Sequence, residues 1–352
     1  MRRMTRIAGT AAVVALALTG CAAEDEPGTA SADLCEVEGE GPKVGVAYDV
    51  TGRGDKSFND SAAVGIQKAI DDLDATCTEG EAQPDEGDPA REDRIRALAE
   101  AGNSPVIGVG FAYSIAINNV APDFPDTSFA VVDGFDPDEE PNDNVAYLGF
   151  AEQEGSFLVG TAAALKTEAD HVGFVGGVNN DLIKKFEAGY VAGVEEVNPD
   201  IEVDVTYIEE TSLAGFNDPA GAKAAAAAMY DGGADIVYHA AGLSGDGVFD
   251  AAVDAGEGNW AIGVDSDQYL TASADQKEHI LTSMLKRVDT SVFDTIKAVD
   301  DGEPLVSYQV YDLKSDGISY STSGGFIDDI TSDIDGYAEQ IESGEIKVPT
   351  TP

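Results

Sequence analysis

Positive charge is scarce in this sequence. Its 352 residues include 20 Lys and Arg against 67 Asp and Glu, which gives a net charge of −47 and an isoelectric point near 4.1. A chain this acidic repels phosphate backbones, so we exclude DNA or RNA binding as its function. We attribute the acidity itself to a soluble, well-solvated surface, because net charge bears on solubility rather than on fold.

Histidine and cysteine are also rare, with three of each. The histidines, His171, His239 and His279, lack the H-E-x-x-H spacing of a zinc site, so we expect no metal and no cofactor. The sequence has no G-x-S-x-G nucleophile motif. The segment 52–57 fails as a phosphate-binding loop, because Asp55 stands where a glycine must precede the lysine. These absences favour a binding protein over an enzyme.

Long hydrophobic runs are missing after the first twenty residues. There, three arginines precede the apolar run 8–18, which is too short to span a bilayer and ends at Leu18-Thr19-Gly20-Cys21. This ending resembles a bacterial lipobox. We predict a signal peptide over residues 1–20, a lipid on Cys21 and a flexible tether over 21–42, with secretory cleavage near Ala22-Ala23 as the alternative. The protein is then anchored on the outer face of the cell membrane.

Two further cysteines are Cys35, in the later part of the tether segment, and Cys77. In an exported protein, two thiols form a disulfide more often than a metal site. We therefore predict a Cys35–Cys77 bond that pins the N-terminal segment to the first helix-loop region.

Short apolar segments alternate with helical patterns from residue 43 onward. The first run gives strands at 43–48, 105–110, 128–132 and 144–150, and the pattern then restarts with strands at 171–175, 201–207, 236–238 and 260–264. Such alternation predicts parallel sheets covered by helices on both faces, arranged as two α/β lobes. We assign residues 43–150 plus about 268–308 to the first lobe, and 151–267 plus about 309–345 to the second.

Polar residues end several of these strands. Ligands of open α/β sheets bind beyond the carboxyl ends of the strands, where Asp49, Asp133, Asp265 and Lys286 are expected. Carboxylates that accept bonds from neighbouring hydroxyls are typical of sugar recognition, although each aspartate alone is equally explained as a helix N-cap. Phe58, at a helix entry, either packs into the core or offers its ring to the cleft.

An ordered set of motifs resembles one family, the basic membrane protein lipoproteins, also called the purine nucleoside receptor A family. The likeness covers roughly residues 43–345, and its motifs appear in the family order. They are Tyr48-Asp49 with Gly52-x-x-Asp55-Lys56-Ser57-Phe58-Asn59, Phe129-Ala130-Val131-Val132-Asp133, Phe174-Val175-Gly176-Gly177, Phe186-x-x-Gly189-Tyr190, Phe216-x-Asp218, Gly233-Ala234-Asp235-Ile236, Ala241-Gly242-x-x-Gly245-x-Gly247, Ile262-Gly263-Val264-Asp265-x-Asp267-Gln268 and Thr282-Ser283-x-x-Lys286.

The resemblance implies a type I periplasmic-binding-protein fold, with two Rossmann-like lobes joined by a three-segment hinge. The crossings would fall near 150–151, 267–280 and 307–311. It further implies a monomeric substrate-binding lipoprotein of an ABC importer, which captures a purine nucleoside and delivers it to a permease and its ATPase.

The resemblance also implies roles for individual residues. Phe58 and Phe216 would stack on the purine, and Asp49 would face the base edge with Ser57 or Asn59 nearby. The remaining members of the implied site are Asp133, Asp265 and Lys286 at the ribose hydroxyls, Gly242 at a close backbone approach, and Phe186 on the pocket wall.

Two alternatives stay open at this point. The same fold could hold another small solute, such as a sugar or a signal molecule. Alternatively, the chain could be an exported nucleoside hydrolase that uses Asp49, Asp55 or Asp133 for acid–base chemistry. A phosphorylated ligand is disfavoured, since one lysine among several aspartates makes a poor phosphate site.

Overall fold

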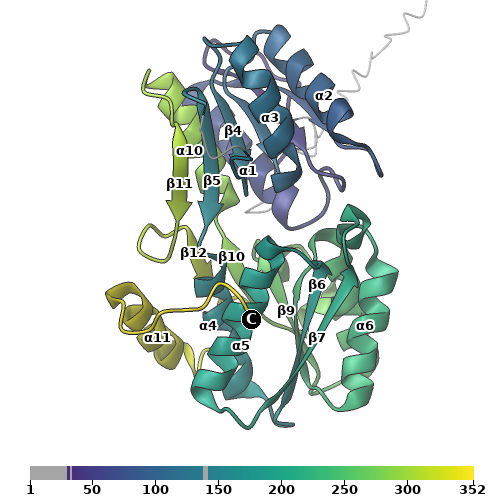
Figure 1. The fold of residues 1–352 in the computed structure, drawn as a ribbon. Coiled ribbons are helices and arrows are strands. Elements are labelled where there is room, and N and C mark those ends of the chain that lie inside the picture. Colours follow the sequence, from purple (N-terminus) through teal and green to yellow (C-terminus); the bar gives the residue numbers. More distant parts are fainter. Residues whose placement is uncertain (1–29, 32–33, 138–141) are drawn as a thin grey trace, which may run out of the picture.

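The computed structural model describes residues 30–31, 34–137 and 142–352. These residues form two α/β lobes, one above the other in Figure 1. The predicted signal peptide, Cys21 and residues 22–29 and 32–33 of the predicted tether lie outside the described residues. Within the described part of the chain, no helix combines the length and the apolar character needed to cross a bilayer.

The first lobe is built on a six-stranded parallel sheet with the order β11-β5-β4-β3-β1-β2. Alternate residues of its strands point to two separate apolar clusters, one under α1 and α10 and the other under α2 and α3. The elements are β1 (Lys43–Tyr48), α1 (Phe58–Leu73), β2 (Thr76–Glu81), α2 (Asp88–Glu100), β3 (Val106–Val109), α3 (Ser114–Val120), β4 (Phe129–Val132), β5 (Val145–Phe150), α10 (Val288–Asp300) and β11 (Ser307–Tyr311).

The second lobe repeats this design with the strand order β12-β10-β9-β8-β6-β7. Its sheet is parallel except for β12, which runs antiparallel to β10. Helices α4 and α5 cover one face, and α6 and α7 the other. The elements are α4 (Glu152–Lys166), β6 (His171–Val178), α5 (Asp181–Val197), β7 (Glu202–Glu209), α6 (Pro219–Gly232), β8 (Ile236–Ala240), α7 (Gly245–Ala255), β9 (Trp260–Asp265), α8 (Gln268–Thr271), α9 (Ala274–Lys277), β10 (Ile280–Lys286), β12 (Ile318–Tyr320) and α11 (Thr331–Ser343).

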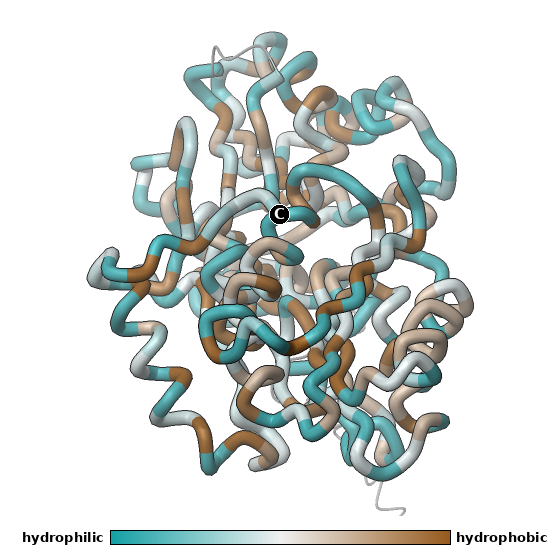
Figure 2. Tube along the Cα trace, turned by 60° about the horizontal axis from the view of Figure 1, so that its bottom comes forward, coloured by the Kyte–Doolittle hydropathy of each residue, from teal (hydrophilic) through white to brown (hydrophobic). Residues whose placement is uncertain are grey.

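The outer helices pack by one face each. In Figure 2, hydrophobic and hydrophilic residues alternate along the peripheral helices, as expected where only one face is buried. Helices α4 and α5 approach closely, because a Cβ at Gly189 would lie 2.1 Å from the carbonyl oxygen of Gln153, and one at Gly193 2.1 Å from that of Phe157. This contact fixes the two helices that carry Glu152 and Phe186 toward the cleft.

The chain crosses between the lobes three times. The first crossing, at Phe150 and Ala151, lies where it was predicted. The second was predicted at 267–280, with residues 268–308 in the first lobe. This is wrong for residues 268–286, since α8 and α9 pack against elements of the second lobe and β10 pairs with β9 in the second sheet. That crossing lies at Arg287, between β10 and α10. The third lies between β11 and β12 rather than within 307–311, because β11 pairs with β5 in the first sheet.

A disulfide joins Cys35 to Cys77, with an S–S distance of 2.04 Å. Cys77 lies in β2, so the bond holds the N-terminal segment to a sheet edge and not to the predicted helix-loop region. The sequence pattern missed β2. Its TCTEGE sequence has the exposed, polar character of an edge strand and lacks an apolar run.

Candidate functional site

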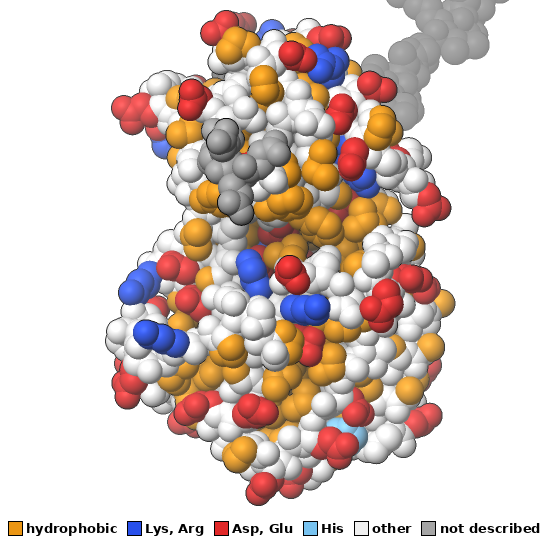
Figure 3. All heavy atoms as spheres, in the orientation of Figure 1, with side chains coloured by type: hydrophobic (Ala, Val, Ile, Leu, Met, Phe, Trp, Pro, Cys, Tyr) orange, Lys and Arg blue, Asp and Glu red, His pale blue; other side chains and the backbone are white. Residues whose placement is uncertain are grey.

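A cavity with an empty volume of about 580 Å³ lies between the two lobes. Figure 3 shows the molecule hollowed at this level, with hydrophobic side chains on the walls of the hollow. Its lining combines apolar and aromatic side chains with a few polar groups, which is typical of small-molecule sites. Both lobes supply its walls, and the lining residues sit at the carboxyl ends of the strands, as the strand-end rule predicts.

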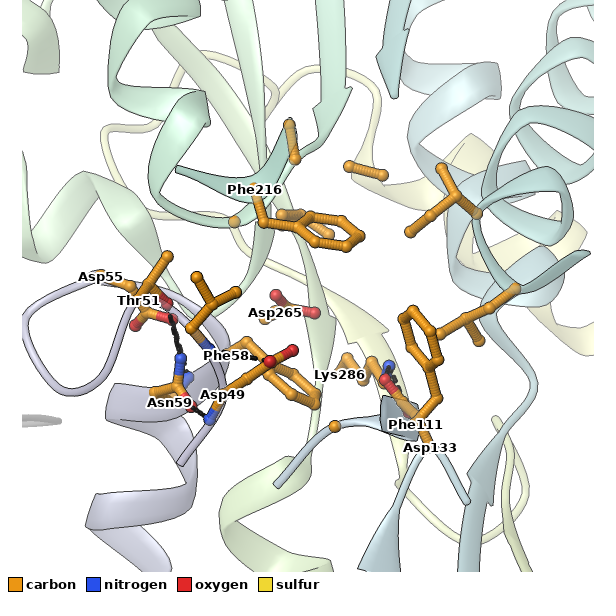
Figure 4. A pocket seen from close by; sticks show the side chains of 18 of the residues that line it. Asp49, Thr51, Asp55, Phe58, Asn59, Phe111, Asp133, Phe216, Asp265 and Lys286 are labelled. Carbon is orange, nitrogen blue, oxygen red and sulfur yellow. Dashed lines mark hydrogen bonds and ion pairs between the residues drawn. The ribbon is translucent and has the colours of Figure 1, made fainter. Parts of the chain in front are cut away.

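The structure brings the predicted residues together. All of them except Ser57 line the cavity, and Ser57 lies directly behind it, with Oγ 2.7 Å from Asp265 Oδ2. The lining residues that were predicted are Asp49, Phe58, Asn59, Asp133, Phe186, Phe216, Gly242, Asp265 and Lys286. Figure 4 shows the arrangement of those that it labels, which leaves out Phe186 and Gly242.

Several lining residues were not predicted, among them Thr51, Phe111 and Ile183. Phe111 follows β3 and the strand-end residue Gly110, so the strand-end rule carried a signal for it. Ile183 lies in the first turn of α5, and no local pattern distinguishes it from a core residue of that helix.

The charged centre of the cavity is Lys286, at the end of β10. Its Nζ lies 2.6 and 2.7 Å from the two carboxylate oxygens of Asp133 and 3.5 Å from Glu152 Oε1. Burial alone lowers the pKa of Lys286, but the carboxylates of Asp133, Glu152 and Asp265 outweigh it and raise that pKa above its usual value. Because Asp133 belongs to the first lobe and Lys286 to the second, this charged pair spans the cleft.

Glu152, which the sequence analysis did not single out, is the fully buried first residue of α4. Its Oε2 accepts a hydrogen bond of 3.1 Å from Lys185, while Oε1 faces Lys286. Glu152 and Lys286 stand in the same lobe, so Glu152 is a counterion that does not depend on the position of the first lobe. A buried cation left without such a partner would be strongly destabilising.

Aromatic rings surround this charge. The Lys286 ammonium lies 5.2 Å from the centre of the Phe58 ring, 4.9 Å from Phe150 and 5.5 Å from Phe186. Phe216 enters from the second lobe, and Figure 4 shows its ring and that of Phe58 on opposite sides of the cavity. Phe58 therefore lines the cavity while part of its surface contacts the core.

Asp133 and Asp265 occupy matching places, after β4 in one lobe and at the end of β9 in the other. Both have a left-handed backbone, with φ of 59° and 65°, a conformation that aspartate adopts more readily than most residues. Burial raises the pKa of Asp133 to about 6, although Lys286 opposes the shift. Burial also raises the pKa of Asp265, against the opposing effects of Lys286 and of the Ser57 hydrogen bond.

A network of polar groups fixes the loop after β1. Asn59 Oδ1 accepts a bond from the Asp49 N–H (3.1 Å), and its Nδ2 donates to Thr51 Oγ1 (2.7 Å) and Asp55 Oδ2 (3.0 Å). Asp55 in turn accepts bonds from the backbone N–H groups of Ser57, Asn59 and Asp60 at the start of α1. Asn59 is thus occupied in holding the loop.

Asp49 is held so that one carboxylate oxygen accepts a bond from the Val50 N–H (2.8 Å). The other, Oδ2, has no hydrogen-bond donor within the described parts of the chain, and the carboxylate lines the cavity. Gly110 permits this position, because a Cβ there would lie 2.8 Å from Oδ2. Asp49 therefore presents an acceptor to whatever enters the cavity.

Gly242 serves a backbone purpose. Its φ is +55°, a conformation that residues with a side chain rarely adopt. A Cβ at this position would make ordinary van der Waals contacts with Phe216, at 3.4 and 3.5 Å, so the backbone and not a lack of space favours glycine.

Polar bonds join the two lobes across the cleft. Besides the Ser57–Asp265 bond, Ser266 Oγ donates to the Ser57 carbonyl (3.0 Å), and Lys56 Nζ lies 3.2 Å from Asp246 Oδ2. These contacts need the lobes close together, so the structure represents the closed conformation.

Among the described residues, side chains of the types that bind metal ions come together at a place outside the cavity. His171, Glu202 and Asp204 come together at the amino ends of β6 and β7, the edge opposite the cavity. His171 Nε2 lies 3.0 Å from Asp204 Oδ2. Exposed clusters of acidic residues are common in proteins that bind no metal ion, so this cluster does not by itself indicate a metal site.

Known protein families and relatives agree on what the chain resembles. The family described as ABC transporter substrate-binding protein PnrA-like matches residues 42–352. The ABC transporter nucleoside-binding protein BmpA of Lactococcus lactis is 31% identical over 366 residues, which cover 99% of each chain. The CD4+ T-cell-stimulating antigen of Listeria monocytogenes is 33% identical, over 88% of this chain and 88% of its own. Basic membrane protein A1 of Borrelia garinii is 31% identical, over 89% of this chain and 90% of its own.

Solved structures show the same architecture. An ABC transporter solute-binding protein from Aeropyrum pernix superposes with a TM-score of 0.74 at 28% identity, over 88% of this chain and 93% of its own. An ABC transporter solute-binding protein from Conexibacter woesei superposes with a TM-score of 0.69 at 26% identity, over 87% of this chain and 99% of its own. The predicted type I fold of two Rossmann-like lobes is confirmed.

Asp49 provides a test of the electrostatics of the cavity. Burial raises its pKa to about 6, above the value near 3.9 of an unfolded chain, so the folded state binds the proton more tightly. The contribution of Asp49 to stability therefore falls as pH rises from about 4 to about 6, because the buried carboxylate must then ionise. We expect Asp49→Asn to match the wild type near pH 4 and to exceed its free energy of unfolding by about 3 kcal/mol at pH 7.5.

Urea unfolding across this pH range measures the difference. The exposed Asp126, replaced by Asn, is the matched control and should show no such trend. A constant difference between Asp49→Asn and wild type from pH 4 to 7.5 would contradict the pKa shift.

Proposed function

The chain belongs to the basic membrane protein family of PnrA-like ABC transporter substrate-binding proteins, and from this we propose that it captures a purine nucleoside in its cleft. The family consists of binding components of transporters and not of enzymes, so the hydrolase alternative is discarded.

One observation carries the choice of ligand. The cavity places two phenyl rings opposite each other, and it places carboxylates and one ammonium together at Lys286. A flat ring with hydroxyls attached to one end matches this division, since aromatic rings stack on any base and carboxylates accept bonds from neighbouring hydroxyls. The name of the nucleoside-binding relative from L. lactis supports the same ligand class.

In this proposal, Phe58 and Phe216 stack on the two faces of the purine. The free oxygen of Asp49 accepts a bond from an N–H on the base edge, while Asn59 keeps the loop in place. The ribose hydroxyls bind at Asp133, Asp265 and Lys286, with Ser57 orienting Asp265.

The charge of the site favours a neutral ligand. Asp49, Asp55, Asp133 and Asp265 line the cavity together with one lysine, whose charge Asp133 and Glu152 already balance. A nucleoside carries no charge to oppose this arrangement. A nucleoside monophosphate would bring a dianion to a site with no uncompensated cation along its lining.

The remaining parts of the proposal concern transport. Closure of the lobes over the ligand would form the surface that a permease recognises, and the ATPase would act through that permease. The protein would act as a monomer. A lipid on Cys21 would hold it at the outer face of the membrane while the domain captures its ligand.

The first test is calorimetric titration of the purified protein with inosine, guanosine, adenosine, their monophosphates and free sugars. We expect nucleosides to bind and monophosphates to bind far more weakly. Phe58→Ala should weaken nucleoside binding by about 1–3 kcal/mol, the range for loss of one stacked ring. Phe293→Ala, which removes a ring on α10 outside the cavity, should leave affinity unchanged.

If a sugar binds and no nucleoside does, the proposed ligand is wrong, although the assignment of the fold is unaffected. Nucleoside binding that Phe58→Ala does not weaken would remove this ring from the base.

Asp265 tests the ribose end. We choose Asp265→Asn because asparagine also tolerates the left-handed backbone at this position. Loss of a charged acceptor for the ribose hydroxyls should weaken inosine binding about tenfold or more. The affinity for hypoxanthine, which has no ribose, should change about twofold at most. The comparison uses the two titrations side by side. Asp267→Asn, two residues away and outside the cavity, is the control; equal losses for both ligands would place the ribose elsewhere.

Cys21 tests the anchor. Cys21→Ser removes the thiol that would carry the lipid, so the protein should move from the detergent phase to the aqueous phase when cells are fractionated with Triton X-114. The Cys35→Ser, Cys77→Ser double variant, which leaves Cys21 in place, should stay in the detergent phase. Retention of Cys21→Ser with the detergent would argue against lipidation at this residue.

A further inference from the structure

Lys185 lies outside the cavity but is connected to it through a buried carboxylate. It stands in the second turn of α5, and its side chain is 34% exposed. Its Nζ donates a hydrogen bond of 3.1 Å to Oε2 of Glu152, whose side chain is fully buried. The other oxygen of Glu152 faces Lys286 in the cavity. One carboxylate therefore stands between a partly exposed lysine and the lysine of the proposed binding site.

The two oxygens of Glu152 are used unequally. Oε2 accepts the bond from Lys185, whereas Oε1 lies 3.5 Å from the Lys286 ammonium and has no hydrogen-bond partner among the described residues. Buried acceptors are normally satisfied, and an ammonium is a strong donor, so this gap needs a cause. The bond to Lys185 supplies one, since it holds the other oxygen of the same rigid carboxylate.

Lys286 has a closer partner in the other lobe. Its Nζ lies 2.6 and 2.7 Å from the two oxygens of Asp133, so the cation pairs with the carboxylate across the cleft in preference to Glu152 in its own lobe. Both carboxylates raise the pKa of Lys286, and they compete for the same ammonium. Whatever fixes Glu152 therefore affects the pair that joins the two lobes at the cavity.

We propose that Lys185 is a positioning residue for ligand binding: by holding Glu152 at Oε2, it leaves the Lys286 ammonium to Asp133. This inference rests on the proposed function, in which Asp133 and Lys286 bind the ribose hydroxyls. Without Lys185, Glu152 would stay ionised, because it is the first residue of α4, where the helix dipole favours a negative charge. The released carboxylate would then turn to Lys286 and draw it from Asp133.

This shift would disturb the ribose end of the site. Asp133 would become a buried carboxylate without its counterion, at a place where the ribose hydroxyls have to bind. One of the polar contacts that join the lobes would weaken at the same time. Both effects lower the affinity for a nucleoside, although Lys185 itself does not line the cavity.

Calorimetric titration with inosine tests this role. Lys185→Met keeps an aliphatic stem and removes the charge, and it should weaken inosine binding about fivefold or more. Lys185→Arg, which keeps a cation for Glu152, should stay within about twofold of wild type. Lys184→Met is the matched control and should bind as wild type does. Lys184 precedes Lys185 in α5, lies outside the cavity lining, and forms no ion pair within the described parts of the chain.

A double-variant comparison separates this route from a general loss of stability. In the Glu152→Gln background, no carboxylate on α4 competes for Lys286, so the addition of Lys185→Met should change inosine affinity about twofold or less. An equal loss in both backgrounds would show that Lys185 acts by another route. Unchanged affinity in Lys185→Met alone would also overturn its role.

Crystal structures of wild type and Lys185→Met in the same crystal form give a test that needs no ligand. In the variant, we expect Glu152 Oε1 to lie within hydrogen-bond distance of Lys286 Nζ, and Nζ to lie farther from Asp133. Unchanged distances would refute the positioning role even where nucleosides bind. If wild type binds no nucleoside, the proposed function fails, and the two structures still decide whether Lys185 positions Lys286.

Discussion

The geometry of the cleft depends on one ammonium group. Lys286 reaches from the second lobe to both carboxylate oxygens of Asp133 in the first, at 2.6 and 2.7 Å. A buried lysine is tolerable only with close counterions, and Glu152 supplies a second one from the same lobe as the lysine. Asp133 is therefore the counterion across the cleft and Glu152 the counterion within the lobe. This arrangement ties the closed state to the residues that we propose to hold the ligand.

The duplicated topology explains why the site residues converge. With the strand orders β11-β5-β4-β3-β1-β2 and β12-β10-β9-β8-β6-β7, β4 corresponds to β9 and β5 to β10. Asp133 and Asp265 then occupy equivalent places, and both adopt the same left-handed turn. Two sheets that face each other with their carboxyl ends at a shared cleft bring these aspartates together, although 132 positions of sequence separate them. Each lobe thus contributes the same kind of group to opposite sides of the ligand.

Features that depend on the local sequence pattern, such as apolar strands and the residues at their ends, could be predicted from the sequence. Features that depend on contacts between distant segments could not. Strong apolar strands such as 43–48 and 260–264 were recognised, and their ends gave Asp49 and Asp265. The edge strand β2 has no apolar run, so nothing local marked it. The lobe assignment of β10 depends on its pairing with β9, which a strand pattern does not encode. Glu152 looks like an ordinary acidic residue in a first helical turn, and only the packing of α4 against β10 reveals that it is fully buried beside Lys286.

The closed structure also constrains how the proposed ligand would gain affinity. Asp265 already accepts a bond from Ser57, and Asp133 is already paired with Lys286. Ribose hydroxyls that bind there meet acceptors whose positions these contacts already fix, so the ligand does not have to order them. The phenyl rings face the cavity with apolar surface still to bury. Under the proposed function, stacking on Phe58 and Phe216 therefore supplies affinity for the base, while the preset carboxylates give the preference for ribosides over free bases.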